Sequence, residues 1–171
     1  MRWQKRVAVV VPAFNESEHI QSVVREIPDW VDRVVVVDDG SCDGTGELVS
    51  GVSDRVVIVR HQQNRGVGAA LQSGYERALS EDADVVAVMA GDGQMRADEL
   101  EAIVEPIARG LADYSKGDRT SHPGGERMPR VRRLGTFVLT LWTRRLSGFR
   151  HLEDAQCGFT AISSEMLREL P

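Results

Sequence analysis

The sequence predicts an α/β fold with a mostly parallel central sheet, and three observations favour it. Short runs rich in valine alternate with longer segments whose apolar residues recur every three or four positions. Clusters of glycine, proline, aspartate and asparagine, which favour turns, separate these segments. Because strands that alternate with helices form βαβ units, the chain should build a parallel sheet covered by helices.

The elements are expected in regular order over the first 110 residues. Four buried strands are predicted at 6–14, 33–38, 54–61 and 83–91, and four helices at 17–27, 45–50, 66–80 and 97–110. The first helix should start at a Ser17 cap and end at Pro28, while Pro106 should kink the last one. The buried face of the first helix is predicted to consist of Ile20, Val23, Val24 and Ile27.

The second half of the chain has a less regular pattern. Residues 121–129 are rich in glycine, proline and charge, which indicates a mobile loop. Residues 130–148 are a helix candidate with an apolar stripe and arginines at both ends. That stripe is either ordinary core or the face of an amphipathic helix that lies in a membrane interface.

The charge of the chain is unevenly distributed. The 171 residues are 42% hydrophobic and carry a formal net charge of −5, so nucleic-acid binding is not expected. Residues 116–150, however, hold nine Lys/Arg and two Asp/Glu, a local excess of +7. This asymmetry favours an anionic partner at one place, although a solvated basic face is the simpler alternative.

The cysteines and the lengths of the apolar runs indicate the cellular compartment of the protein. Cys42 and Cys157 are far apart and lack metal-ligand spacing, so neither a disulfide framework nor a zinc site is expected. No signal peptide precedes the first strand, and no apolar run reaches the roughly 18 residues of a membrane span. We therefore expect a protein of the reducing cytoplasm.

Polar and turn-forming residues stand at the ends of three of the predicted strands. In chain order they are Pro12, Asn15 and Glu16, then Asp38 and Asp39, then Gly91, Asp92, Gly93 and Gln94. Ligands bind at the carboxyl ends of parallel strands, so both aspartates of the Asp38–Asp39 pair should face a cleft rather than the core. Oxygen ligands without soft atoms suit Mg²⁺ or Mn²⁺, which completes its shell with water and substrate phosphates. The alternative is that the carboxylates only cap strand ends.

The segment "NRGVGAA" (64–70) precedes and opens a predicted helix. It lacks the third glycine of a dinucleotide-binding fingerprint, so that interpretation is weak. Asn64 and Gly68 could instead place a phosphate at the free N–H groups of the first helical turn.

Six segments in order carry a resemblance to a known family: "VVVPAFNES", "VVVVDDGSCDGT", "NRGVGAALQSGY", "VMAGDGQM", "DYSKGDR" and "DAQCGFTAI". The chain resembles the family 2 inverting glycosyltransferases, and most closely their dolichol-phosphate mannosyltransferase and polyprenyl-phosphate glycosyltransferase branch. The resemblance covers about residues 6–163. It implies a GT-A fold, with three α/β/α layers, in one catalytic domain over residues 1–171. The end of the chain within a predicted helix suggests a C-terminal truncation.

The resemblance implies a role for each donor-side position. Pro12, Phe14 and Glu16 match the motif that holds the donor's nucleoside, with Phe14 where the family often has tyrosine. Asp39 matches the aspartate that contacts the base or the ribose, and Asp38 supports it. The expected nucleotide-sugar site is completed by Asn15, Asn64, Gly68, Gly91, Asp92 and Gly93.

On the metal and acceptor side, Asp92 and Gln94 match the family's metal-binding D-x-D-x-Q segment. Arg119 matches an arginine that engages phosphate, while Asp154 and Gln156 match a segment that lines the acceptor side. The expected catalytic residues are Asp92, Asp154 and Arg119. Asp154 would be the general base for an alcohol acceptor, whereas a lipid phosphate needs no base because its second pKa is about 6.

The function implied is inverting transfer of a hexose from a GDP-mannose or UDP-glucose type donor to a polyprenyl or dolichyl phosphate. It would take place on the cytoplasmic face of the membrane, with peripheral attachment, and a homo-oligomer is left open. The residues expected to hold the acceptor phosphate are Arg119, Arg130, Arg132, Arg133 and Gln156.

One position departs from the family pattern, and two alternatives to the implied function stay open. Ala90 replaces the first acidic residue of the D-x-D-x-Q segment, which predicts weaker metal affinity. A non-catalytic nucleotide-sugar-binding domain is therefore one alternative. Transfer to a glycan hydroxyl in polysaccharide synthesis is the other.

Overall fold

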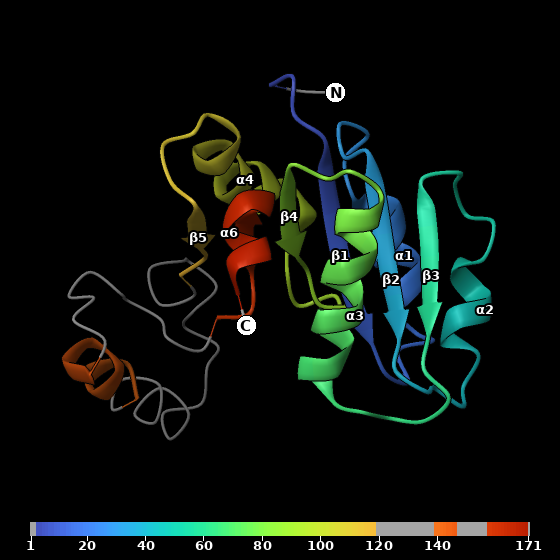
Figure 1. The fold of residues 1–171 in the computed structure, drawn as a ribbon. Helices are drawn as coiled ribbons and strands as arrows, with labels where there is room; N and C mark the ends of the chain where they lie inside the picture. Colours follow the sequence, from blue (N-terminus) through green and yellow to red (C-terminus); the bar gives the residue numbers. More distant parts are fainter. Residues whose placement is uncertain (1–2, 119–138, 147–156, 171) are drawn as a thin grey trace. The chain divides into compact units, whose positions relative to one another are not determined.

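The computed structural model describes residues 3–118, 139–146 and 157–170. The chain divides into two compact units, the larger comprising residues 1–115 and 159–171 and the smaller residues 116–158. All helices and strands that surround the candidate site belong to the larger unit, which is shown with its labels in Figure 1.

The core of the larger unit is a six-stranded, mostly parallel sheet of order β3-β2-β1-β4-β6-β5. Its strands are β1 (Val7–Ala13), β2 (Arg33–Asp38), β3 (Val56–Arg60), β4 (Val85–Val88), β5 (Tyr114–Lys116) and β6 (Thr160–Ser163). β1 pairs in parallel with β2 and β4, β2 pairs in parallel with β3, and β6 runs antiparallel to β4. The predicted fold class is therefore confirmed.

Helices cover both faces of this sheet. They are α1 (Ile20–Glu26), α2 (Thr45–Val49), α3 (Val67–Ser80), the 3₁₀ turn η1 (Ala97–Glu99), α4 (Leu100–Ala108) and α6 (Ser164–Glu169). In Figure 1, α3 and α6 lie in front of the sheet, and α1, α2 and α4 lie behind it. This is the three-layer α/β/α arrangement.

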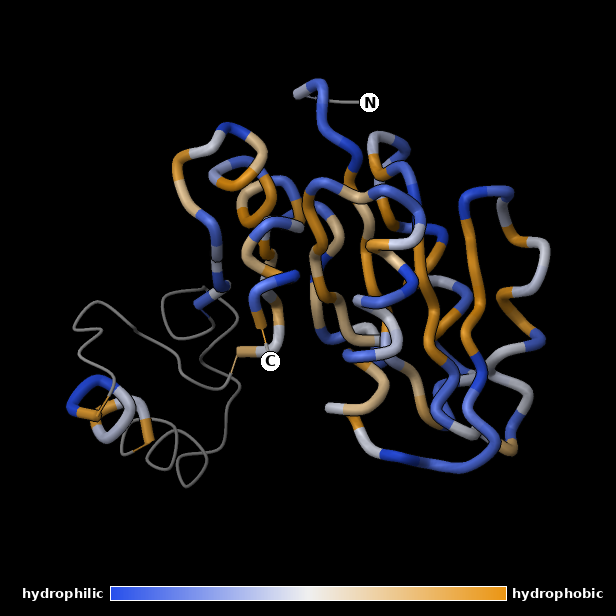
Figure 2. Tube along the Cα trace, viewed as in Figure 1, coloured by the Kyte–Doolittle hydropathy of each residue, from blue (hydrophilic) through white to orange (hydrophobic). Residues whose placement is uncertain are grey.

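Burial on both faces explains the uninterrupted valine runs. Alternate residues of β1 and β2, such as Val10 and Val37, pack with Ala70 and Ala78 of α3. The residues between them, such as Val9 and Val36, are equally buried against the other layer. Strands covered on both faces have no polar side, so they show no alternation. Figure 2 shows this as hydrophobic colour along the central strands.

Two helix boundaries differ from the sequence prediction. The predicted cap at Ser17 is wrong, because α1 begins at Ile20 after His19 and has no side-chain cap. Ser17 lies before the helix, where its N–H donates to Asp43 Oδ2 at 3.0 Å. The helix predicted at 97–110 is two elements, η1 and α4, with Pro106 inside α4. The predicted face of α1 is confirmed, since all four of its residues are at most 2% exposed.

In the second half, β5 and β6 are short strands that the sequence pattern did not indicate. β6 has only four residues, and buried runs of that length lack a distinctive period. Residues 139–146 are helical, within the predicted 130–148 helix, and Leu139, Leu141, Trp142 and Leu146 on it are exposed. The 121–129 loop lies outside the described residues. No helix in the described part of the chain is long and apolar enough to cross a membrane.

Gly74 in the middle of α3 allows the helix to approach the sheet closely. A Cβ at this position would lie 2.3 Å from Val10 Cγ1 and 3.2 Å from Val37 Cγ2. We expect Gly74→Ala to lower the free energy of unfolding by about 1–3 kcal/mol, because these valines are buried and cannot yield. Urea denaturation measures the change.

Gly68, on the first turn of the same helix, is the matched control for this prediction. A Cβ there meets nothing within 4 Å, so Gly68→Ala should stabilise the chain slightly through helix propensity. If both substitutions changed the free energy of unfolding equally, the close approach of α3 to the sheet at Gly74 would be contradicted.

Candidate active site

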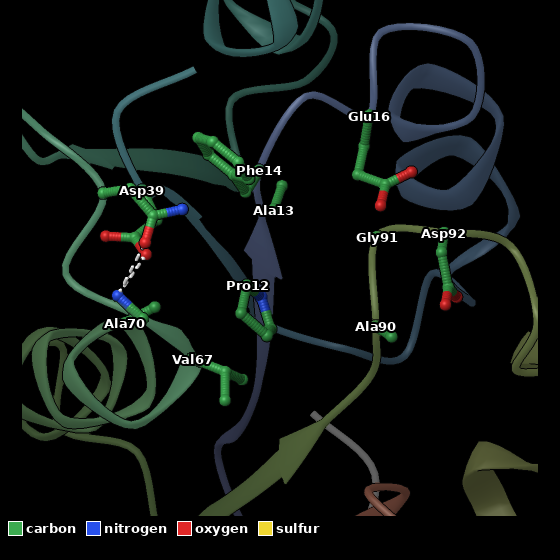
Figure 3. A pocket seen from close by; sticks show the side chains of 12 residues that line it. Pro12, Ala13, Phe14, Glu16, Asp39, Val67, Ala70, Ala90, Gly91 and Asp92 are labelled. Atoms are coloured by element: carbon green, nitrogen blue, oxygen red, sulfur yellow. Dashed lines mark hydrogen bonds between the residues drawn. The ribbon is translucent and has the colours of Figure 1, made fainter.

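A pocket of about 310 Å³ opens at the carboxyl edge of the parallel strands. It is formed by the ends of β1, β2 and β4 and by the start of α3. The lining residues are Pro12, Ala13, Phe14, Glu16, Asp39, Asn64, Gly66, Val67, Ala70, Ala90, Gly91 and Asp92. Figure 3 shows Asp39 on one side of the pocket and Glu16 and Asp92 on the other, with Pro12 between them.

Seven of the residues predicted for the donor site line this pocket. They are Pro12, Phe14, Glu16, Asp39, Asn64, Gly91 and Asp92. Four other predicted donor-site residues and the predicted metal ligand Gln94 do not line it. The four are Asn15, Asp38, Gly68 and Gly93. The structure therefore brings together side chains from three strand ends, as expected.

Asp39 is a buried carboxylate with three hydrogen-bond donors. His61 Nδ1 lies 2.6 Å from Asp39 Oδ1, and the backbone N–H groups of Arg65 and Gly66 donate to Oδ1 and Oδ2 at 3.0 and 2.8 Å. Burial by itself would raise the pKa of Asp39, but these hydrogen bonds outweigh burial and lower it. Asp39 is therefore held ionised at the pocket wall.

Asp38 has a different role, and the expectation that both aspartates face the cleft is wrong for it. It is 6% exposed, and its Oδ1 accepts the N–H of Ser41 at 2.9 Å. Gly46 packs against its Oδ2 so closely that a Cβ at Gly46 would lie 2.4 Å from it. Asp38 shapes the turn that carries Asp39, because a short polar side chain bonds readily to nearby backbone.

The loops after β1 and β2 are tied together by side chains. Asn15 N–H donates to Ser41 Oγ at 3.0 Å, and Cys42 N–H donates back to Asn15 Oδ1 at 3.0 Å. Asn15 has φ = 56°, a left-handed conformation that asparagine tolerates better than most residues. Asn15 therefore supports the pocket wall from outside.

Thr45 and Asp43 tie the same two loops at a second point. The Glu16 N–H donates to Thr45 Oγ1 at 2.8 Å, and Thr45 Oγ1 donates to Asp43 Oδ1 at 2.5 Å. Asp43 also accepts the Ser17 N–H, so its carboxylate joins both loops. The hydrogen bond from Thr45 is the main reason that the pKa of Asp43 lies well below its ordinary value.

Glu16 and Asp92 place two carboxylates on the opposite side of the pocket. Burial raises the pKa of Glu16, and the negative charge of Asp92 raises it further. Two like charges held this close would both be stabilised by a divalent cation. In the described residues no group of three acidic, histidine or cysteine side chains could hold a metal alone, so a bound Mg²⁺ or Mn²⁺ would need ligands from the substrate.

The segment between β4 and η1 sets the position of Asp92. A Cβ on Gly91 would lie 3.2 Å from Ala13 Cβ and from Ile20 Cδ1, so glycine lets this segment pass close to β1. Gly93 has φ = 71°, which favours glycine. The exposed Gln94 donates its N–H to Asp92 Oδ1 at 3.0 Å, so the predicted metal segment is a tight turn.

The remaining predicted residues lie outside the described part of the chain. They are the catalytic candidates Arg119 and Asp154 and the acceptor-site candidates Arg130, Arg132, Arg133 and Gln156. Their roles stay predictions.

Comparisons with known proteins identify the family of the chain. The family model described as Glycosyl transferase family 2 matches residues 8–170. The chain belongs to glycosyl transferase family 2. The family assignment makes it a glycosyltransferase, as predicted.

Family 2 relatives that act on lipid phosphates are among the similar curated proteins. The chain is 28% identical to a UDP-N-acetylglucosamine–dolichyl-phosphate N-acetylglucosaminyltransferase of Methanococcus voltae, over 97% of this chain and 72% of that protein. It is 30% identical to polyprenol monophosphomannose synthase of Mycolicibacterium smegmatis, over 99% of this chain and 66% of that protein. It is also 30% identical to undecaprenyl-phosphate mannosyltransferase of Micrococcus luteus, over 96% of this chain and 69% of that protein.

A solved structure shows the same fold. Glucosyl-3-phosphoglycerate synthase from Mycobacterium tuberculosis, crystallised with Mn²⁺, UDP and glucosyl-3-phosphoglycerate, matches with a TM-score of 0.75 at 25% identity. The match covers 98% of this chain and 60% of that one, so the chain spans little more than half of the solved protein. The predicted GT-A fold is confirmed.

Sequence reasoning missed two residues that support the site. The sequence patterns described above single out neither His61 nor Ser73. The structure places both behind Asp39. One signal was available: His61 directly follows the third predicted strand, at the edge where the other polar residues gather.

The Asp43–Thr45 contact predicts a measurable shift in titration. In the native chain Asp43 should stay ionised well below its ordinary pKa. Thr45→Val removes the hydroxyl that stabilises the carboxylate, so the pKa of Asp43 should rise toward its ordinary value. Carboxyl-carbon NMR titration measures both.

The same contact predicts a pH-dependent stability with a definite sign. A carboxylate whose pKa is lowered by folding contributes stability at neutral pH and loses that contribution as the pH falls through the folded pKa. The stability difference between the native chain and Asp43→Asn should therefore stay constant from pH 7 to about pH 5 and shrink as the pH falls below the ordinary aspartate pKa of about 3.9. A difference that is independent of pH would contradict the assignment.

Proposed function

We propose that the chain transfers a hexose from a nucleotide-diphosphate sugar to a polyprenyl or dolichyl phosphate, with inversion at the anomeric carbon. The observation that carries the proposal is the position of Asp39, a buried, ionised carboxylate on the wall of a pocket at the carboxyl edge of a family 2 fold. The lipid-phosphate acceptors named for the similar proteins support the choice of acceptor.

Asp39 would recognise the nucleoside of the donor. Its Oδ1 accepts two hydrogen bonds and its Oδ2 one from the described residues, so Oδ2 retains an acceptor position. A base N–H or a ribose hydroxyl could donate to it. GDP-mannose and UDP-glucose both carry such groups, so this contact suits either type of donor.

The diphosphate would lie between α3 and the Glu16–Asp92 side of the pocket. The first turn of α3 starts at Val67, and the first backbone N–H groups of a helix, which have no intrahelical partner, favour an anion. Asp92 and Gln94 are the residues that would hold Mg²⁺ or Mn²⁺, and a bound cation would neutralise charge on the leaving diphosphate. The similar solved structure was crystallised with Mn²⁺ and UDP, which supports this assignment.

The acceptor phosphate would attack the anomeric carbon from the face opposite the diphosphate. The new carbon–oxygen bond forms as the bond to the diphosphate breaks, and no proton has to be removed because the acceptor is already largely dianionic. Arg119, Arg130, Arg132, Arg133 and Gln156 would hold the acceptor. The proposal includes peripheral attachment to the cytoplasmic face of the membrane, through the exposed apolar residues of 139–146.

Donor binding is the first prediction. Calorimetric titration with UDP and with GDP should show that one of them binds, and that Mn²⁺ strengthens its binding. Asp92→Asn should weaken the Mn²⁺-dependent binding by about 10- to 100-fold, because it removes a charged partner.

Asp98→Asn is the matched control for the donor measurement. Asp98 is an exposed carboxylate paired with Arg96, outside the pocket, and its replacement should leave binding unchanged. Failure of both nucleotides to bind, or full Mn²⁺-dependent binding by Asp92→Asn, would count against the proposed function.

The acceptor class is tested with Asp154→Asn. If the acceptor is a lipid phosphate, this variant should keep the rate of sugar transfer within about threefold, since no general base is needed. A loss of about 10²- to 10⁴-fold would instead indicate a hydroxyl acceptor that depends on Asp154 as base. Transfer of radiolabelled sugar to polyprenyl phosphate in detergent measures the rate.

A further inference from the structure

A chain of hydrogen bonds runs from the pocket to α3. His61 Nδ1 lies 2.6 Å from Asp39 Oδ1, and His61 Nε2 lies 2.9 Å from Ser73 Oγ. The side chains of His61 and Asp39 are 6% and 4% exposed, so water cannot easily replace the contact between them. Because Nδ1 faces a carboxylate, it carries a proton, and in the neutral ring Nε2 accepts the Ser73 hydroxyl.

Strand register brings the first two members of this chain together. β2 and β3 pair Asp38 with Arg60, and the N–H of His61 extends the pairing by donating to Asp38 O at 2.9 Å. Asp39 and His61 are thus the first residues beyond two adjacent parallel strands. Ser73 comes from α3, which packs over β1 and β2.

His61 makes a contact to Asp39 that the backbone donors do not. Among the described residues it is the side-chain donor to this carboxylate, while Arg65 and Gly66 donate through their N–H groups. These two N–H groups belong to the loop before α3. The imidazole, in contrast, is held by Ser73 of α3, so it fixes the orientation of the carboxylate relative to that helix.

We propose that His61, held by Ser73, is a positioning residue that orients the Asp39 carboxylate so that Oδ2 meets the donor nucleotide. The inference rests on the proposed function and deepens it. His61 does not line the pocket, so it acts through Asp39 and not by touching the nucleotide.

This role predicts a specific pattern of losses. Without the imidazole, Asp39 loses a hydrogen bond to its charged form, and nucleotide affinity should fall by roughly 10- to 100-fold. The nucleoside is remote from the anomeric carbon, so KM for the donor should rise while kcat stays nearly unchanged. A merely structural role would lower the stability and the active fraction without separating KM from kcat.

The experiment is calorimetric titration of the 171-residue chain with UDP and GDP, each with Mn²⁺, together with thermal unfolding of every variant. We expect His61→Leu to bind roughly 10- to 100-fold more weakly. His61→Asn should stay within about fivefold of the native chain, because its amide N–H can replace Nδ1–H. Ser73→Ala should weaken binding by about three- to tenfold.

Ser80→Ala is the control for Ser73→Ala. Ser80 lies at the other end of α3, where its hydroxyl donates to Arg77 O, so its replacement should leave binding unchanged. Should His61→Leu fail to fold, the comparison of Ser73→Ala with Ser80→Ala still decides the question, because the proposal requires weaker binding in the first and unchanged binding in the second.

The outcomes separate the two claims. If the native chain binds neither nucleotide, the proposed function is overturned and the positioning role with it. If the native chain binds one of them and Ser73→Ala and the folded His61 variants bind it equally well, only the positioning role is overturned. It is equally overturned if His61→Asn loses as much affinity as His61→Leu.

Discussion

The parallel pairing of β1 with β2 and β4 fixes where the candidate site lies and how the sheet is covered. It places the carboxyl ends of these strands at one edge, so the residues that follow them must meet there. It also requires helical connections, which bury both faces of the sheet. Valine in the strands and polar residues just beyond them are two consequences of one arrangement.

The polar edge is stable because its buried groups bond to one another. Two adjacent aspartates at the end of β2 have different partners. Asp38 accepts a hydrogen bond from the Ser41 N–H in the turn that follows. Asp39 accepts hydrogen bonds from the loop before α3 and from His61. Burial of a carboxylate without such donors would be costly. The same donors leave one acceptor position of Asp39 toward the pocket, which links the stability of the turn to the binding of a ligand.

Prediction from sequence succeeded where a local pattern reflects burial or backbone geometry. The valine runs and the spacing of Ile20, Val23 and Val24 placed the strands and α1 within a few residues. It failed at the Ser17 cap, because α1 starts only at Ile20 and Ser17 lies in the preceding loop, where it bonds to Asp43 of another loop. β6 was missed for a similar reason: its pairing with β4 is a contact between distant segments and leaves little mark on four residues.

Local sequence patterns specify the fold class, the edge of the sheet where the site lies, and most of its pocket residues, because strand ends and turn residues are local features. The tertiary structure decided which of two adjacent aspartates faces the pocket, and that His61 and Ser73 stand behind it. These depend on strand register and on the packing of α3 over the sheet. Register and packing are set by contacts between segments that are far apart in the chain, and no single segment records them.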